Sequence, residues 1–175
     1  MIKNILNVIL LAGIVGLTSQ CQPSAPTEST TDSNTENVQS DSLTQNTLYA
    51  RLESSVDPLS LQDSMMIRFT VTNPTADTLK FSAYHTPFEG LISKFLTVTD
   101  SAGQEISYQG PMAKRVMPPP AESYHNLAPQ QEESTSFDLK KIYKIEKAGS
   151  YTLQYNGGEI SGMDNGEPIT IHVVE

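Results

Sequence analysis

The second part of this chain, from Leu48 onwards, alternates apolar and polar residues with a period of two. The clearest example is the run Met65, Ile67, Phe69 and Val71, which alternates with Met66, Arg68, Thr70 and Thr72. Successive side chains of a β-strand point to opposite faces, so this pattern predicts strands with one buried face. Because no stretch keeps a helical period over ten residues, we expect an all-β fold.

Turn-forming residues divide the alternating region into short segments. Asp57-Pro58, residues 62–64, Asn73-Pro74 and residues 100–103 have the composition of turns. The expected strands lie near 48–52, 65–71, 79–83, 96–98, 106–108, 134–139, 150–155 and 168–174. Many short strands at this spacing favour an immunoglobulin-like antiparallel β-sandwich of about 7–9 strands over residues 48–175.

Tyr151 stands near the start of the expected strand 150–155, directly after Gly149-Ser150. In immunoglobulin-like sandwiches a tyrosine near the start of the penultimate strand bonds its hydroxyl to nearby upstream backbone, which is called a tyrosine corner. Two interpretations are open. Tyr151 forms such a corner, or Tyr151 and Tyr155 only pack on the sheet.

Residues 1–20 have the pattern of an export signal. Lys3 supplies one positive charge, and an apolar run interrupted only by Asn7 extends from Ile5 to Leu17. This run is shorter than the roughly 20 residues that a membrane-spanning helix needs. It therefore predicts a signal peptide and not a stable anchor.

Cys21, the only cysteine, follows this signal directly. Its position resembles that of the lipidated cysteine of bacterial lipoproteins, although Gln20 stands where that pattern usually has a small residue. Residues 22–47 contain no aromatic residue, Lys or Arg, and such a composition predicts a disordered tether. We expect a protein lipid-anchored in the bacterial cell envelope, at the outer membrane. The alternative is ordinary secretion with an incidental thiol.

The charge and the missing motifs exclude several classes of protein. Eleven Lys and Arg against twenty Asp and Glu give a net charge of −9, so we expect no nucleic-acid partner. A single cysteine and the separated histidines His85, His125 and His172 do not have zinc-ligand spacing. The sequence contains no HExxH, GxSxG, Walker or GxGxxG motif. We therefore expect no catalytic residue, metal site or cofactor, and no enzyme activity.

Three motifs within residues 48–155 are more specific than the general pattern. They are T-P-F-E-G at 86–90, Y-x-G-x-x-x-K-R at 108–115 and G-S-Y-T-L-Q-Y at 149–155. With them the chain resembles the N-terminal, non-catalytic, pro-domain-like β domain of bacterial deuterolysin-like (aspzincin) metallopeptidases. The family's HExxH helix does not occur in these 175 residues. The resemblance thus implies a stand-alone lipoprotein that carries only the non-catalytic domain.

Two functions are compatible with this resemblance. The first is a protein-binding domain whose partner is a secreted or periplasmic metallopeptidase, which it would inhibit or help to fold as a detached pro-domain. The second is a structural or adhesive immunoglobulin-like envelope lipoprotein without a peptidase partner. A remnant enzyme has no supporting motif.

The first function directs attention to Lys114-Arg115, an adjacent basic pair in an acidic domain. Pro118–Pro120 remove three backbone donors and favour polyproline II geometry. We expect a stiff, exposed loop from Gly110 to Tyr124, in which both cations contact the partner. Alternatively, Arg115 pairs with a neighbouring carboxylate in a solvated turn. The second expected contact lies just upstream and consists of His85, Thr86, Pro87, Phe88 and Glu89.

Overall fold

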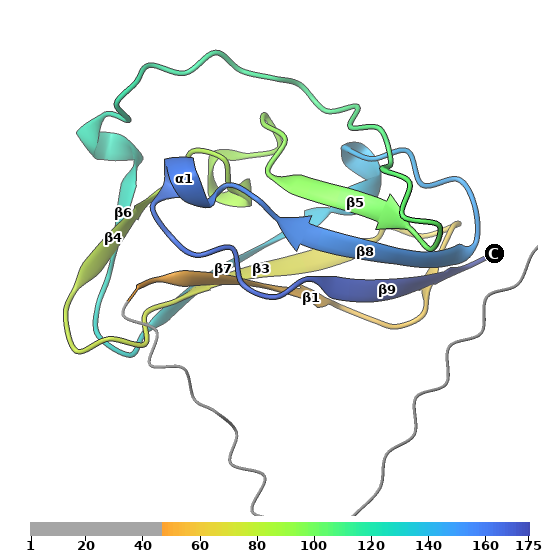
Figure 1. The fold of residues 1–175 in the computed structure, drawn as a ribbon, viewed down its shortest axis with the longest axis horizontal. Coiled ribbons are helices and arrows are strands. Elements are labelled where there is room, and N and C mark those ends of the chain that lie inside the picture. Colours follow the sequence, from red (N-terminus) through yellow and green to blue (C-terminus); the bar gives the residue numbers. More distant parts are fainter. Residues whose placement is uncertain (1–46) are drawn as a thin grey trace, which may run out of the picture. The chain divides into compact units, whose positions relative to one another are not determined.

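A computed structural model describes residues 47–175, which form an all-β sandwich (Figure 1). The predicted fold class is therefore confirmed. The predicted signal peptide, Cys21 and residues 22–46 of the predicted tether lie outside the described residues. Within residues 47–175, no helix combines the length and the apolar character needed to cross a bilayer.

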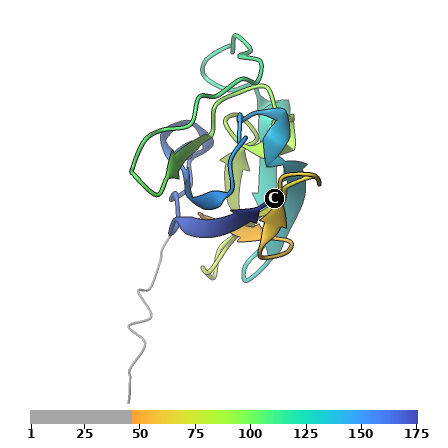
Figure 2. The same ribbon diagram turned by 90° about the vertical axis from the view of Figure 1, so that its right-hand side faces the viewer.

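The sandwich consists of two main sheets. The first has the order β1-β3-β7, formed by β1 (Tyr49–Ser54), β3 (Met66–Thr72) and β7 (Glu132–Asp138). The second has the order β2-β9-β8-β5, formed by β2 (Leu59–Ser60), β9 (Ile169–Val174), β8 (Gly149–Tyr155) and β5 (Leu96–Asp100). All pairs in these sheets are antiparallel except β2 with β9. Figure 2 shows the domain from the end at which the C-terminus lies.

Shorter elements complete the domain. Strands β4 (Leu79–Ser82) and β6 (Tyr124–Leu127) pair in a small separate sheet. Three 3-10 turns, η1 (Pro87–Glu89), η2 (Ala121–Ser123) and η3 (Leu139–Lys141), and the four-residue helix α1 (Gly158–Ser161) lie between strands. Residues 101–120, between β5 and η2, form a long connection without a named strand.

The predicted strand at 106–108 is wrong. Glu105 and Ile106 still pair with β5, and the Ile106 N–H donates to the Val98 carbonyl at 2.8 Å. The chain then leaves this sheet, because Tyr108 instead bridges to Tyr143 and the two rings meet edge to face at 5.5 Å. This departure carries the connection away from β5.

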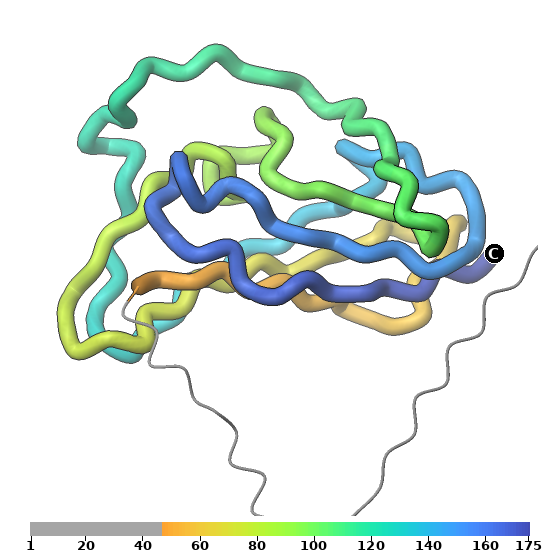
Figure 3. Tube along the Cα trace, viewed as in Figure 1, coloured from red at the N-terminus to blue at the C-terminus, as the bar shows by residue number. Residues whose placement is uncertain are grey.

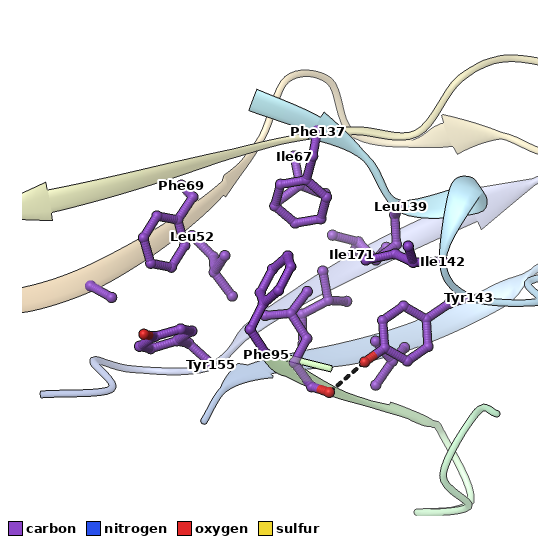
Figure 4. Packing of buried hydrophobic residues seen from close by; sticks show 14 of the residues in the cluster. Leu52, Ile67, Phe69, Phe95, Phe137, Leu139, Ile142, Tyr143, Tyr155 and Ile171 are labelled. Atoms are coloured by element: carbon purple, nitrogen blue, oxygen red, sulfur yellow. Dashed lines mark hydrogen bonds between the residues drawn. The ribbon is translucent and has the colours of Figure 1, made fainter. Parts of the chain in front are cut away.

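The predicted alternation is confirmed in the core between the sheets. Met65, Ile67, Phe69 and Val71 are all completely buried. Phe69 of β3 meets Tyr155 of β8 with ring centroids 5.0 Å apart, which joins the two sheets (Figure 4). Phe95 and Phe137 form a second such contact at 5.3 Å.

Tyr151 forms the tyrosine corner, which is the first of the two interpretations that the sequence left open. Its hydroxyl donates to the Lys147 carbonyl at 2.8 Å, while the residue itself is buried at the start of β8. Tyr155, in contrast, packs in the core and donates to the Ser161 hydroxyl at 2.9 Å. The interpretation in which both tyrosines only pack on the sheet is therefore wrong.

Candidate functional site

Residues 111–117, which we call the exposed segment, expose an unusual amount of apolar surface. Five large hydrophobic side chains are exposed within residues 47–175, and three of them are Met112 (68%), Val116 (73%) and Met117 (59%) of this segment. In Figures 1 and 3 the segment is part of the green-to-teal arch that runs over the domain. Apolar side chains gathered in this way mark a candidate interaction surface.

Arg115 holds the exposed segment onto the domain. Its Nε donates to Oε2 of Glu89 at 2.9 Å, and its Nη2 lies 2.6 Å from Oε1 without the alignment of a hydrogen bond. Only 14% of the Arg115 side chain and 8% of the Glu89 side chain are exposed. The guanidinium also lies 5.0 Å from the centroid of the Tyr84 ring. Arg115 is thus the only long side chain of residues 111–117 that is directed inward.

The Glu89 carboxylate is held from the other side by the segment 85–93. Its Oε1 accepts hydrogen bonds from the His85 N–H at 3.1 Å and from the Ser93 hydroxyl at 2.9 Å. These hydrogen bonds and the opposite charge of Arg115 compensate for the removal of the carboxylate from water. We call this arrangement of Glu89, Arg115, Ser93 and His85 the anchor.

Thr86 gives the anchor a fixed geometry by capping η1. Its hydroxyl accepts from the Phe88 N–H at 3.1 Å and donates to the Ala83 carbonyl at 2.7 Å. Phe88 packs against Phe81, with ring centroids 5.4 Å apart, and against His125, at 5.2 Å. The turn that carries Glu89 is therefore fixed both by a cap and by the core.

The structure changes the role expected for residues 85–89, which the sequence suggested as a second contact with the partner. Thr86 and Pro87 are buried, and His85, Phe88 and Glu89 are half-buried residues with internal hydrogen bonds or packing partners. Thr86 is completely buried and has no surface to offer a partner, whereas Pro87 lines a surface pocket together with Gly90 and Leu91. Residues 85–89 support the exposed segment from within.

The two alternatives for Arg115 are also resolved. Arg115 pairs with a carboxylate, as the second alternative held, but that pair is largely buried and not solvated. The expectation of two exposed cations is wrong for Arg115. Lys114 is exposed and has no ion pair among residues 47–175.

Two further hydrogen bonds fix the N-terminal half of the exposed segment. The Tyr108 hydroxyl donates to the Pro111 carbonyl at 2.9 Å, and the Ala113 N–H donates to the Ile92 carbonyl at 2.9 Å. Burial, and secondarily the charge of Glu89, raises the pKa of Tyr108. Tyr108 therefore remains a neutral donor across the physiological pH range.

Sequence reasoning missed the apolar part of this surface. Met112, Val116 and Met117 received no role, and Glu89 was not linked to Arg115, which lies 26 residues away. One signal was available, because both residues belong to the motifs that were singled out, at 86–90 and 108–115. That signal does not reveal the pairing itself.

The three histidines occupy separate places in the structure. His125 stacks on Phe81 at 5.0 Å, and its Nδ1 lies 2.8 Å from Glu133 Oε1. His172 lies on β9, with Nδ1 3.1 Å from Asp57 Oδ2. Within residues 47–175, no three His, Cys, Asp or Glu side chains are grouped in a way that could hold a metal ion.

Known protein families and curated proteins were compared with the chain. No family model matches it. It is 25% identical over 120 residues to the "Neutral protease 2 homolog" of Arthroderma gypseum, covering 67% of this chain and 32% of that protein. It is 27% identical over 113 residues to a protein named as a probable neutral protease 2 homologue in Arthroderma otae, covering 64% and 30%. The chain spans about a third of the length of the curated relatives that it matches.

The predicted deuterolysin-like resemblance is thus supported as a weak similarity to fungal neutral protease 2 homologues. Among solved structures, the β-glucosidase of Listeria innocua in complex with gluconolactone aligns at 13% identity with a TM-score of 0.35, covering 72% of this chain and 16% of that one. Its complex with glucose gives 12% identity, a TM-score of 0.34 and coverages of 72% and 16%.

Proposed function

We propose that residues 47–175 are a non-enzymatic, protein-binding domain that acts on a peptidase, as an inhibitor or a detached pro-domain does. The exposed segment carries this proposal. It presents Met112, Val116 and Met117 to solvent while Arg115 and Glu89 hold it in place. A surface of this kind binds more tightly than a mobile loop, because less conformational freedom is lost on binding.

The similarity to neutral protease 2 homologues suggests the kind of partner. The match covers only about a third of each relative, so most of each relative lies outside the matched part. In an inhibitor or detached pro-domain, a domain similar to one part of a peptidase would bind the remaining part. A peptidase of the neutral protease 2 type is therefore the first candidate partner. The chain itself has no HExxH motif, and residues 47–175 hold no metal-binding cluster. These observations favour binding over catalysis.

The proposal is tested with the purified, active neutral protease 2 homologue of Arthroderma gypseum. Residues 47–175 are titrated into its assay with a protein substrate, and binding is measured separately by biolayer interferometry. We expect concentration-dependent inhibition, with the domain intact on a gel at the end of the assay. A serine peptidase of unrelated fold serves as the control. Absence of binding at micromolar concentrations would overturn the proposal and favour the structural or adhesive alternative.

The cellular location forms a separate part of the proposal. The apolar run before Cys21 and the composition of residues 22–47 support a lipid anchor in the bacterial envelope, facing a secreted or periplasmic metallopeptidase. Two or three acyl chains would give stable membrane attachment. Intact-mass measurement of membrane-extracted protein should show acylated Cys21, and Cys21→Ser should yield an uncleaved precursor or a soluble protein. An unmodified Cys21 in the membrane fraction would contradict this part.

A further inference from the structure

The exposed segment offers nearly all of its side chains to a ligand, and Arg115 is the exception. Met112 and Val116 are 68% and 73% exposed, Lys114 between them is exposed, and Arg115 is turned inward against Glu89. Residues spaced two apart lie on the same side of an extended chain. In a partner that binds this segment as an extended chain, Met112, Lys114 and Val116 would therefore form one outward row, and the exposed Ala113 and Met117 would lie outside it.

The backbone of this row is free to pair. Among the described residues, the Ala113 N–H is the only backbone N–H of residues 112–117 that donates to another backbone group. No backbone carbonyl of residues 112–117 accepts such a bond within residues 47–175. The N–H and C=O groups of Lys114 and Val116 are therefore available to a strand of another protein.

The charge of the row restricts the partner surface. Residues 106–121 contain no Asp or Glu, whereas the folded part of the chain as a whole is acidic. Arg115 is neutralised by Glu89, so Lys114 is the one cation that the row offers. An apolar cleft with a negative charge opposite Lys114 is complementary to it.

We infer that residues 112–116 bind as an added β-strand in the substrate cleft of the peptidase partner, with Met112 and Val116 in apolar pockets and Lys114 facing a carboxylate. This inference rests on the proposed function. In such recognition, main-chain hydrogen bonds supply affinity, and pockets for alternate side chains supply specificity. The anchor holds the segment on the domain before it binds, and it would hold the chain in place within the cleft.

The test uses the same neutral protease 2 homologue with two variants, Lys114→Glu and Val116→Asp. Each should raise Kd at least about tenfold, because the first reverses a complementary charge and the second puts a charge into an apolar pocket. The effect of Lys114→Glu should shrink as salt is raised. Matched controls are Lys147→Glu, another exposed lysine, and Val56→Asp, at a valine that is 58% exposed. Both controls should bind within about twofold of the wild type.

Hydrogen exchange tests the strand geometry independently. The amides of Lys114 and Val116 should become protected in the complex, whereas the exchange of the β3 amides should stay unchanged. If the wild-type domain binds but both row variants bind equally well, the inference fails and the proposed function stands. If the variants weaken binding without protection of these amides, the added-strand geometry fails. If the wild type does not bind, the proposed function itself fails.

Discussion

The two sheets and the exposed segment place apolar and charged side chains in opposite ways. In β3 the apolar Phe69 faces the core and the charged Arg68 faces solvent. In the exposed segment the apolar Val116 faces solvent, and Arg115 is turned inward. The first arrangement stabilises a fold by burial of apolar surface. The second leaves apolar surface uncovered and uses a buried ion pair to hold the backbone, which is the property expected of a binding surface.

The largest expected effect comes from the core side of this comparison. Phe69→Ala should lower the free energy of unfolding by roughly 3–5 kcal/mol, because Phe69 is completely buried and packs against Tyr155. Met112→Ala, which removes an exposed apolar side chain, should change it by less than about 0.5 kcal/mol. Urea unfolding followed by circular dichroism measures both. Similar effects of the two substitutions would remove the distinction between the regions.

The anchor should show the next largest effect. Glu89→Gln should cost roughly 2–4 kcal/mol, because it leaves the Arg115 charge largely buried without its counter-ion. The exposed pair Arg51–Glu53, with side chains about half exposed, is a matched control, and Glu53→Gln should cost less than about 1 kcal/mol. Adding Arg115→Met to Glu89→Gln should recover part of the loss. Equal effects of Glu89→Gln and Glu53→Gln in urea unfolding would show that Arg115 is not held by Glu89.

Alkaline pH should act on the core and not on the outward row. Burial raises the pKa of Tyr143 and of Tyr155 above the ordinary value of about 10, and Tyr143 also donates to the Leu96 carbonyl (Figure 4). Above that pH the tyrosines of the unfolded chain ionise while those of the folded chain stay neutral, so stability is lost as pH rises. The melting temperature should therefore fall as the pH rises above about 10. The melting temperature of Tyr143→Phe should fall less steeply over this pH range. Equal declines in the wild type and the variant would argue against a buried Tyr143.

The tyrosine corner should give the smallest of these effects. Tyr151→Phe removes the hydrogen bond to the Lys147 carbonyl but keeps the ring, so it should cost about 0.5–1.5 kcal/mol. Thermal unfolding resolves a change of this size. A cost well above that range would mean that the hydroxyl fixes more of the entry to β8 than this one bond.

The sheets were predictable because their physical cause is local and repeated. Met65, Ile67, Phe69 and Val71 carry the alternation in sequence, and each is buried in the structure. The strand expected at 106–108 was wrong because Tyr108 pairs with Tyr143, a contact between residues 35 positions apart in the chain. The local alternation of apolar and polar residues gives no information on whether Tyr108 pairs with β5 or with Tyr143.

The candidate site was predictable only in part. The sequence pointed to residues 110–124 through its proline run and basic pair, and the exposed segment lies there. It left Arg115 either exposed to a partner or paired with a carboxylate. The choice depends on Glu89, because a separate turn places its Oε2 2.9 Å from Arg115 Nε. In the structure Arg115 takes the inward position, and Met112 and Val116 are exposed. Pattern reasoning assigns apolar residues to the core and therefore overlooks such a surface.

The order of the exposed segment in solution tests the central claim most directly. Backbone ¹⁵N relaxation on residues 47–175 reports order parameters for Met112 to Val116. We predict values near those of the rigid backbone, about 0.85, in the wild type and below about 0.6 in Glu89→Gln, because the variant loses the anchor. Values below about 0.6 in the wild type itself would contradict the account, since a mobile segment would not be held ready for a partner.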